Sequence, residues 1–328
     1  MVVFPIYLKI ISLFWVTLRV LLAASASSWL VLWVSLEINL LGFALFMVLG
    51  GLSISNNLAI KYLVVQSLGS RAILVATLLS ISQVAQPIRR LMFWVSLSLK
   101  LGLFPFHGWI IRILCKLRWE AFVGLVTIQK LLPLLIISSF AQTGRILLAT
   151  LNLVAMATAA LVNSHISATL SYLSAAGASW ALIPNSFALS LSYLALYGIS
   201  IATFVYAVGA SGGTGEGSVA LIMQTWARAF AVVCLLLRAR GMPPLLGFWV
   251  KLIILLNLGK DYLLAMVLIL LVSLMVLLAY IRMAVPSLMG RGVTGALPVS
   301  LTLPLMAPGV TMLLFPLVFF IYKCRCLA

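Results

Sequence analysis

The sequence predicts an all-α protein, a polytopic bundle of transmembrane helices, and two observations support this fold class. Hydrophobic residues make up 65% of the 328 positions, whereas charged residues make up only 8%. A soluble domain of this size could not cover its surface with so few charges. Uncharged stretches such as 183–215 and 262–281 match or exceed the roughly 20 residues that a transmembrane helix needs.

The apolar runs, divided by turn residues and charges, predict about eleven spans. They lie near 4–25, 28–50, 57–80, 90–116, 120–140, 144–163, 166–184, 187–208, 222–257, 262–284 and 300–322. The N-terminal stretch lacks a cleavage site and is not an Arg/Ser-rich transit sequence, so we interpret it as the first span. We expect residues 1–328 to form a single transmembrane domain.

Two of the predicted spans are too long for one crossing, and each contains a helix-breaking motif. The first, about 90–116, breaks at "GLFPFHG", where Pro105 would free the carbonyl of Leu101. The second, about 222–257, breaks at "RGMPPLLGF", through Gly241, Pro243 and Pro244. In lipid, freed backbone groups must be buried in protein or line a cavity. Paired interruptions in the two halves of a chain are typical of inverted repeats with an ion site at their interface.

Four ionisable residues lie near the middle of predicted spans. Lys100 is ten residues past the Arg89-Arg90 pair, and the residues at a similar depth in their own spans are Glu37, Lys130 and Lys251. Each lies roughly 15 Å from its boundary at the helical rise, which places all four near the bilayer midplane. Ionisable residues at that depth are rare and usually functional. The row predicts a proton path in the plane of the membrane.

The residue types suit a proton switch. A buried lysine can be charged or neutral, depending on how near an acidic partner lies, whereas arginine stays protonated. His107 follows the Pro105 break and could relay protons near physiological pH. His165 lies near a span end, where a structural role is favoured over a relay. The alternative for each lysine is a simple bond to a carbonyl or a reach to the interface.

The composition also excludes several classes of function. The net charge of +17 would suggest nucleic acid in a soluble protein, but the basic residues are scattered singly. We expect them to flank the membrane near anionic lipids, and we expect no nucleic-acid partner. The four cysteines and two histidines fit no metal site, haem or iron–sulfur cluster. Redox chemistry must therefore take place on another polypeptide.

The same stretches resemble subunit 2 of the mitochondrial NADH:ubiquinone oxidoreductase, an antiporter-like subunit family of respiratory complex I. The matching stretches are "WVSLEINLLGF" (33–43), "LAIKYLVVQSLGS" (58–70), "LKLGLFPFHGW" (99–109), "IQKLLPL" (128–134), "TLSYLSAAGASW" (169–180) and "GMPPLLGFWVKL" (241–252). They occur in the order of the family and extend from about residue 27 to 284.

The resemblance implies an inverted-repeat bundle with two discontinuous helices, in the membrane arm of a proton-pumping NADH dehydrogenase of the mitochondrial inner membrane. Its essential glutamate falls on Glu37, and its broken-helix, central and exit-side lysines fall on Lys100, Lys130 and Lys251. NADH, FMN, iron–sulfur clusters and ubiquinone would then be bound by other subunits. The implied partners are other complex I subunits, neighbouring antiporter-like subunits above all, and membrane lipids, with cardiolipin as a candidate.

Three positions depart from the family pattern. Gly177 stands where members usually carry a histidine, Ala168 where a basic residue is often found, and Arg71 where a residue is apolar. Either His165 or water replaces the missing histidine, or that relay step is not required. Two other functions stay open from the residues alone: a free-standing cation/proton antiporter, and a structural spacer that does not pump.

Overall fold

A computed structural model gives the fold and describes residues 23, 25–26, 28–49, 53–79, 86–138, 142–163, 166–209, 246–258 and 262–289. These residues form helices joined by turns, with no strand among them, so the predicted all-α class is confirmed. In chain order the helices are α2 (Trp29–Val48), α3 (Ser53–Leu78), α4 (Gln86–Leu101), α5 (Gly108–Leu114), α6 (Trp119–Val126), α7 (Ile128–Ser138), α8 (Gln142–Val162), α9 (Ile166–Leu182), α10 (Phe187–Gly209), α13 (Leu246–Leu256) and α14 (Leu263–Met289).

Helical stretches in the described part are long and apolar enough to cross a membrane at six of the predicted spans. They are Trp29–Val48, Asn56–Leu78, Trp119–Ser138, Gln142–Val162, Phe187–Phe204 and Leu263–Arg282. The chain is therefore a multi-pass membrane protein. The total of about eleven spans stays a prediction, because the stretch 300–322 and all of 4–25 except residues 23 and 25 lie outside the described residues.

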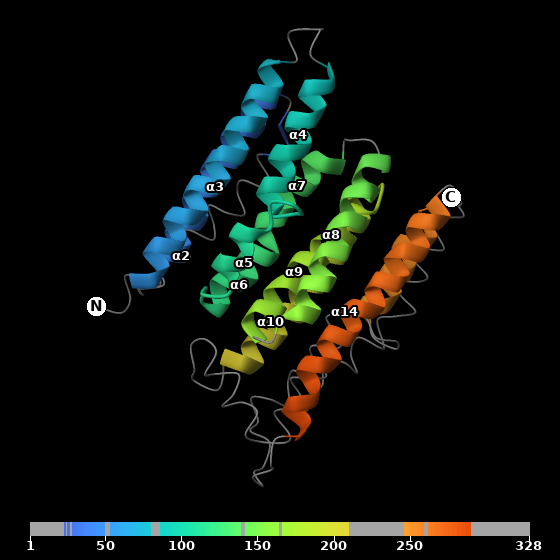
Figure 1. The fold of residues 1–328 in the computed structure, drawn as a ribbon. Coiled ribbons are helices and arrows are strands. Elements are labelled where there is room, and N and C mark those ends of the chain that lie inside the picture. Colours follow the sequence, from blue (N-terminus) through green and yellow to red (C-terminus); the bar gives the residue numbers. More distant parts are fainter. Residues whose placement is uncertain are drawn as a thin grey trace.

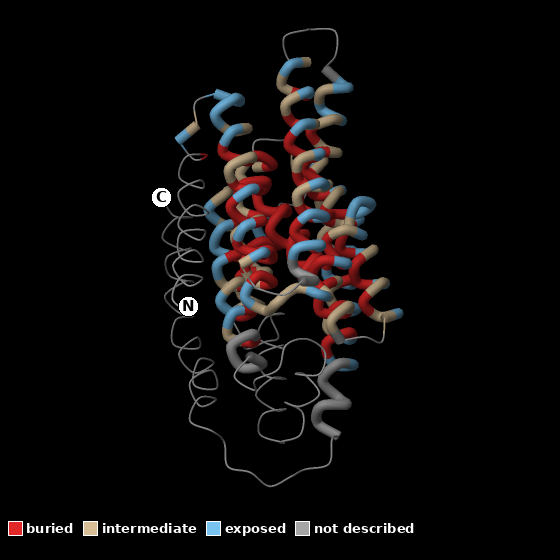
Figure 2. Tube along the Cα trace, turned by 90° about the vertical axis from the view of Figure 1, so that its left-hand side faces the viewer, coloured by how far each residue is buried: buried red, intermediate tan, exposed pale blue. Residues whose placement is uncertain are grey.

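The helices lie side by side in one bundle (Figure 1). Helices α2, α3 and α4 pack in sequence, α8 packs against both α9 and α14, and α9 also contacts α5, α7 and α10. Helix α9 is the most enclosed of the bundle, since every residue from Thr169 to Pro184 except Tyr172 is buried. Its alanines, serines and glycine allow close approach of neighbouring backbones, as is usual for packed membrane helices. Figure 2 shows the buried residues concentrated in the middle of the bundle.

The chain leaves helical conformation between α4 and α5, within the first predicted interruption. Gly102 ends α4 with a φ of +65°, a left-handed conformation that glycine adopts without strain. The Leu103 amide donates to the Ser98 carbonyl at 2.9 Å, and the Gly102 amide donates to the Leu99 carbonyl at 3.2 Å. These two bonds form a Schellman motif, a common way to end a helix.

Pro105 lies in the turn after this helix end, preceded by a cis peptide bond. The helix thus ends at Gly102, before a clash between the proline ring and a helical carbonyl can arise. Gly241, Pro243 and Pro244 lie outside the described residues, so the second interruption stays a prediction. Of the second interrupted stretch, the structure describes α13 and the two residues that follow it.

Candidate functional site

Glu37 lies half-buried on α2, with its carboxylate held by α3. The Ser70 hydroxyl donates a hydrogen bond to Glu37 Oε1. Trp33, one turn earlier on α2, donates from Nε1 to the Ser70 carbonyl at 3.1 Å. Residues four apart share a helix face, so Trp33 and Glu37 bind the same serine from one side. The carboxylate therefore lies against α3.

Lys100 lies on α4 and packs against Gly69, the residue before Ser70 on α3. Its side chain is only 6% exposed. A Cβ atom added to Gly69 would lie 2.8 Å from Lys100 Cγ and 3.4 Å from Lys100 Cε. The lysine chain thus passes directly over Gly69, next to the serine that binds Glu37. The structure therefore brings together the first two of the predicted residues.

The end of α4 explains why a lysine is tolerated at this depth. Lys100 lies in the last turn of α4, where the helix dipole is negative and favours a cation. The exposed carbonyls of that turn also have side-chain donors. Trp109 Nε1 donates to the Leu99 carbonyl at 3.0 Å, and Gln66 Nε2 donates to the Lys100 carbonyl at 3.0 Å. The backbone carbonyls at the end of α4 are thus satisfied inside an apolar bundle.

Asn152, fully buried on α8, holds the turn that follows α4. Its Oδ1 accepts a hydrogen bond from the Phe104 amide at 2.9 Å. Its Nδ2 donates to Ser179 Oγ at 2.8 Å and to the Ala175 carbonyl at 3.2 Å, both on α9. One side chain therefore links the turn, α8 and α9, and it satisfies a backbone group that the interruption leaves unpaired.

Lys130 lies near the start of α7, 3% exposed, and faces α9. Its Nζ donates to the Ser174 carbonyl at 3.1 Å. Thr127 alone separates α7 from α6, and its carbonyl accepts a hydrogen bond from the Lys130 amide at 3.2 Å. The second lysine thus also lies beside an irregularity in its helix, and it binds a backbone carbonyl of the most buried helix.

A buried amide cluster adjoins Lys130. The Gln129 Oε1 atom accepts hydrogen bonds from Asn39 Nδ2 at 2.7 Å and from the Tyr62 hydroxyl at 3.1 Å. Gln129 Nε2 is buried and has no hydrogen-bond partner among the described residues. The three side chains come from α7, α2 and α3, the last two being the helices that carry Glu37 and the Ser70–Gly69 pair. The cluster thus joins α7, the helix of Lys130, to α2 and α3, the helices around Lys100.

Lys251 lies half-buried on α13, with its Nζ over the ring of Trp180, 5.0 Å from the centroid. A cation over the face of a tryptophan is attracted by the ring quadrupole. Trp180 lies on α9, six residues after Ser174, which is about 9 Å along the helix. The structure therefore places Lys130 and Lys251 against successive parts of α9.

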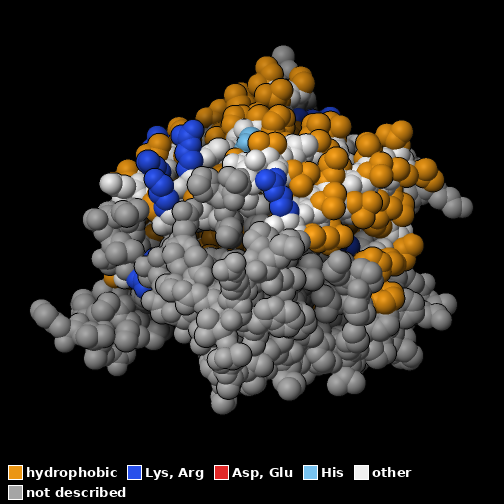
Figure 3. Space-filling view, turned by 60° about the horizontal axis from the view of Figure 1, so that its bottom comes forward, with side chains coloured by type: hydrophobic (Ala, Val, Ile, Leu, Met, Phe, Trp, Pro, Cys, Tyr) orange, Lys and Arg blue, Asp and Glu red, His pale blue; other side chains and the backbone are white. Residues whose placement is uncertain are grey.

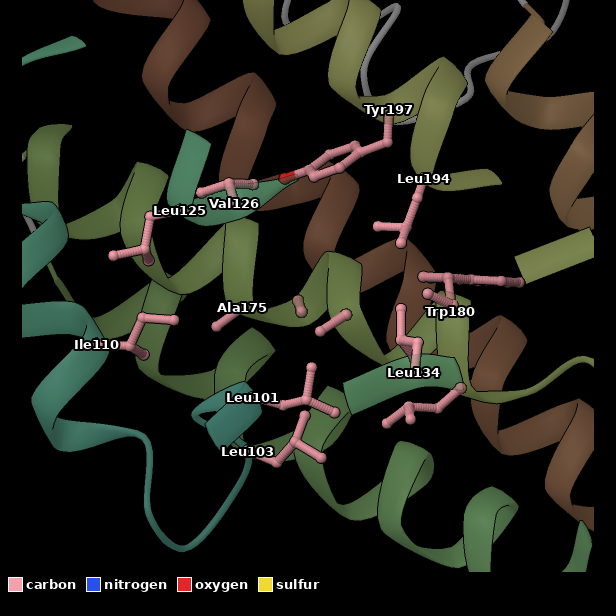
Figure 4. Close-up of a cluster of buried hydrophobic side chains, with 14 of the residues drawn as sticks. Leu101, Leu103, Ile110, Leu125, Val126, Leu134, Ala175, Trp180, Leu194 and Tyr197 are labelled. Atoms are coloured by element: carbon pink, nitrogen blue, oxygen red, sulfur yellow. The ribbon is translucent and has the colours of Figure 1, made fainter. Parts of the chain in front are cut away.

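Apolar packing separates these polar groups. Leu101 and Leu103 lie on the side of Ala175, and Leu134 and Leu194 lie on the side of Trp180 (Figure 4). Leu101 and Leu103, which flank the glycine that ends α4, are at most 1% exposed. Because a low dielectric strengthens every charge interaction, this enclosure makes each lysine sensitive to its partner.

The remaining predicted residues have different surroundings. His107 is the N-cap residue of α5, and its ring stacks on that of Phe104 at 6.0 Å. Its Nδ1 is buried without a hydrogen-bond partner among the described residues. His165 lies outside the described residues. In the described part, no group of three or more metal-binding side chains is found.

Gly177, at the position of the family histidine, packs against Tyr197 of α10. A Cβ atom added to Gly177 would lie 3.1 Å from Tyr197 Cζ and 3.3 Å from its hydroxyl oxygen. Tyr197 is itself buried and stacks on Tyr193 with a centroid distance of 6.0 Å. A larger side chain at Gly177 would therefore have to displace this ring. The Tyr197 hydroxyl therefore lies beside Gly177, where the resemblance led us to expect a histidine.

The residues that sequence reasoning missed are uncharged. They are Ser70, Gly69, Gln129, Ser174 and Asn152, which hold or adjoin the predicted charges. A signal was available for Asn152, because an asparagine ten residues into an apolar span is as unusual as a charge there. The bond that Lys130 donates to Ser174 could not be foreseen, since it ends on a backbone carbonyl.

Solved structures share this fold. A chain of respiratory complex I from Thermus thermophilus aligns with a TM-score of 0.72 at 19% identity, covering 94% of this chain and 78% of that chain. A chain of the Mrp complex from Dietzia sp. aligns with a TM-score of 0.72 at 18% identity, covering 87% of this chain and 62% of that chain. The fold is thus that of a multi-pass helical membrane protein, shared with chains of these two membrane complexes.

Sequence comparison identifies the family within that class. No protein-family model matches the chain. NADH-ubiquinone oxidoreductase chain 2 of Mus musculus is 30% identical over 272 residues, 78% of this chain and 79% of the relative. The chain 2 proteins of Cyprinus carpio and Mytilus edulis are 30% and 27% identical over 260 and 261 residues, respectively. The chain belongs to the NADH-ubiquinone oxidoreductase chain 2 family, as the sequence motifs predicted.

Proposed function

We propose that this chain is a proton-translocating membrane-arm subunit of respiratory NADH dehydrogenase (ubiquinone), in the mitochondrial inner membrane. The observation that carries the proposal is the junction on α3, where Ser70 holds the Glu37 carboxylate and Gly69 lets the Lys100 chain pass. The acidic Glu37 and the basic Lys100 thus contact neighbouring residues of α3 inside the bundle, beside a helix end. Membership of the chain 2 family supports the same function.

The energies are of the right size for a switch. A carboxylate about 4 Å from an ammonium contributes about 4 kcal/mol at an effective dielectric near 20. Moving one charge across the membrane costs about 2.3 kcal/mol per 100 mV. The approach or withdrawal of Glu37 therefore involves more free energy than one proton needs per 100 mV.

In the proposed cycle, electron transfer on other subunits changes the separation of Glu37 and Lys100. Lys100 then takes up or releases a proton, which moves to Lys130. There the contact with the Ser174 carbonyl favours the charged amine. The proton leaves through Lys251, against the membrane potential. His107, with a buried nitrogen in the turn after α4, is a candidate relay.

The rest of the assembly follows from this function. We place NADH, FMN, the iron–sulfur clusters and ubiquinone on other subunits, and we expect antiporter-like subunits and membrane lipids as neighbours. Residues 1–328 would form one domain of inverted repeats. Helices α4 and α5 would be its first interrupted span, and residues 222–257 its second.

The test is Lys100→Met in the assembled complex, with Lys116→Met as the matched control. Lys116 is an exposed lysine just after α5. We expect Lys100→Met to reduce proton pumping and coupled NADH oxidation while the subunit still assembles, because methionine keeps the apolar length but cannot carry a proton. Lys116→Met should leave both unchanged. Unaltered coupled turnover in the Lys100→Met variant would refute the mechanism.

Two further measurements separate the rival functions. A free-standing antiporter would drive proton flux with sodium or potassium when the chain is reconstituted alone. A spacer that does not pump would keep its proton-to-electron ratio when Lys100, Lys130 and Lys251 are all neutralised. The proposal requires no cation-driven flux from the isolated chain and a reduced ratio in the triple variant.

A further inference from the structure

Helix α3 has an exposed apolar stripe opposite its packed face. Tyr62, Ile73 and Ala76 are at most 1% exposed and face the bundle. The exposed residues recur every three or four positions along the other side: Ile60 (58%), Val64 (53%), Leu68 (52%), Val75 (45%) and Leu78 (58%). Residues at this spacing lie on one face of a helix. We call this set the α3 stripe.

Arg71 lies in the middle of the α3 stripe and is exposed. The membrane span of this helix runs from Asn56 to Leu78. Arg71 is seven residues from Leu78 and fifteen from Asn56, which is about 10 Å and 22 Å along the helix. An arginine surrounded by hydrocarbon at that depth is expensive, so it needs a partner.

Lipid headgroups are a poor partner for Arg71. Side chains on a helix tilt toward its N-terminus, which for Arg71 means away from the nearer membrane boundary. Lys61, another exposed cation on α3, lies only five residues from Asn56, and there the same tilt directs the chain toward its boundary. Lys61 can therefore reach the headgroups, whereas Arg71 is directed toward the middle of the bilayer.

The chain itself has few groups that could neutralise Arg71. It contains only four acidic residues: Glu37, Glu120, Glu216 and Asp261. Glu37 is bound by Ser70, and Glu120 is exposed in the first turn of α6, at the end of a span. Glu216 and Asp261 belong to stretches between predicted spans, outside the described residues. Neither of the two described carboxylates pairs with Arg71, so its acidic partner is sought on another polypeptide.

We propose that the α3 stripe is the contact surface for a membrane helix of another subunit, which places an Asp or Glu carboxylate against the Arg71 guanidinium. An apolar face with one central cation is complementary to an apolar helix with one central anion. Figure 3 shows one face of the molecule, where hydrophobic side chains cover much of the described surface and several Lys and Arg side chains lie among them. This inference does not depend on proton translocation.

The test places a photo-crosslinking amino acid, p-benzoylphenylalanine, at Leu68 in the assembled complex in its native membrane. Leu68 is exposed and lies about one turn from Arg71. We expect mass spectrometry to find the crosslink on a membrane-spanning segment of another subunit, with an Asp or Glu within one helical turn of the crosslinked residue. Crosslinks to lipid only, or to a segment without a nearby carboxylate, would overturn the proposal.

A second measurement tests the charge itself. In the Leu68-labelled complex, Arg71→Gln should lower the crosslink yield several-fold, whereas Arg71→Lys should retain much of it. Lys61→Gln is the matched control and should leave the yield unchanged. An equal yield with Arg71→Gln would overturn the ion pair. Proton pumping can be normal or impaired in either case, so failure here is distinguishable from failure of the proposed function.

Discussion

The substitution Asn152→Leu should release the turn that ends α4, and the structure gives the size of the effect. Leucine has the same branched arrangement of side-chain heavy atoms as asparagine but cannot accept the bond from the Phe104 amide. A buried amide left unpaired costs about 1–3 kcal/mol. The Ser179 hydroxyl can turn to a carbonyl of its own helix, so the loss there is smaller, about 1 kcal/mol. Together these losses amount to about 2–4 kcal/mol.

Hydrogen exchange on the assembled complex measures this effect where it arises. Amides of residues 102–107 should lose protection when the turn opens more readily. Because 1.4 kcal/mol corresponds to a factor of 10, the unpaired amide alone predicts faster exchange by about one to two orders of magnitude. Proton pumping should fall as well, since the same turn fixes the C-terminal end of α4 beside Lys100.

The same substitution at Asn163 is the matched control. Asn163 follows α8, and its Nδ2 donates to the Ala159 carbonyl of that helix. Asn163→Leu therefore loses only a local bond and should leave exchange in residues 102–107 unchanged. Equal exchange of that turn in the wild type and in Asn152→Leu would refute the conclusion that Asn152 holds the interruption.

Two other substitutions test the contacts of the lysines. Gly69→Ala brings a methyl group to 2.8 Å from Lys100 Cγ, which should destabilise the α3–α4 contact by about 1–3 kcal/mol and reduce pumping. The control is Gly108→Ala, whose added methyl group meets nothing within 4 Å and should have neither effect. Equal effects of the two substitutions would contradict the close approach of Lys100 to Gly69. Trp180→Leu removes the ring under Lys251, a contribution of about 0.5–2 kcal/mol. Pumping should fall in Trp180→Leu and recover in part in Trp180→Phe; equal pumping by the two variants would show that the aromatic face is not needed.

The fold class and many of the spans could be predicted because the bilayer imposes a simple rule. Backbone groups in lipid must bond within the segment, so an apolar run of sufficient length forms a helix. The runs 28–50 and 262–284 therefore coincide with α2 and α14. Helix ends were less predictable. Pro105 was expected to break a helix, but Gly102 ends α4 first through its left-handed conformation.

The candidate site was predictable in its charges and unpredictable in its partners. Counting residues from the ends of the predicted spans selects Glu37 and Lys100, because a charge inside an apolar run is conspicuous in the sequence itself. The Ser70 hydroxyl and the missing side chain of Gly69, which bring these two together, are ordinary residues of α3 in the sequence. Their importance depends on which face of α3 meets α2 and α4, and packing alone determines that face.

Three lysines of the proposed path have a common element in α9. Lys130 binds the Ser174 carbonyl, and Lys251 lies over Trp180. The turn beside Lys100 connects to the same two turns of α9 through Asn152. In the proposed cycle, a displacement of α9 would change the surroundings of Lys130, of Lys251 and of the turn beside Lys100 at once. One shared helix would then couple the protonation of separate lysines without direct contact between them.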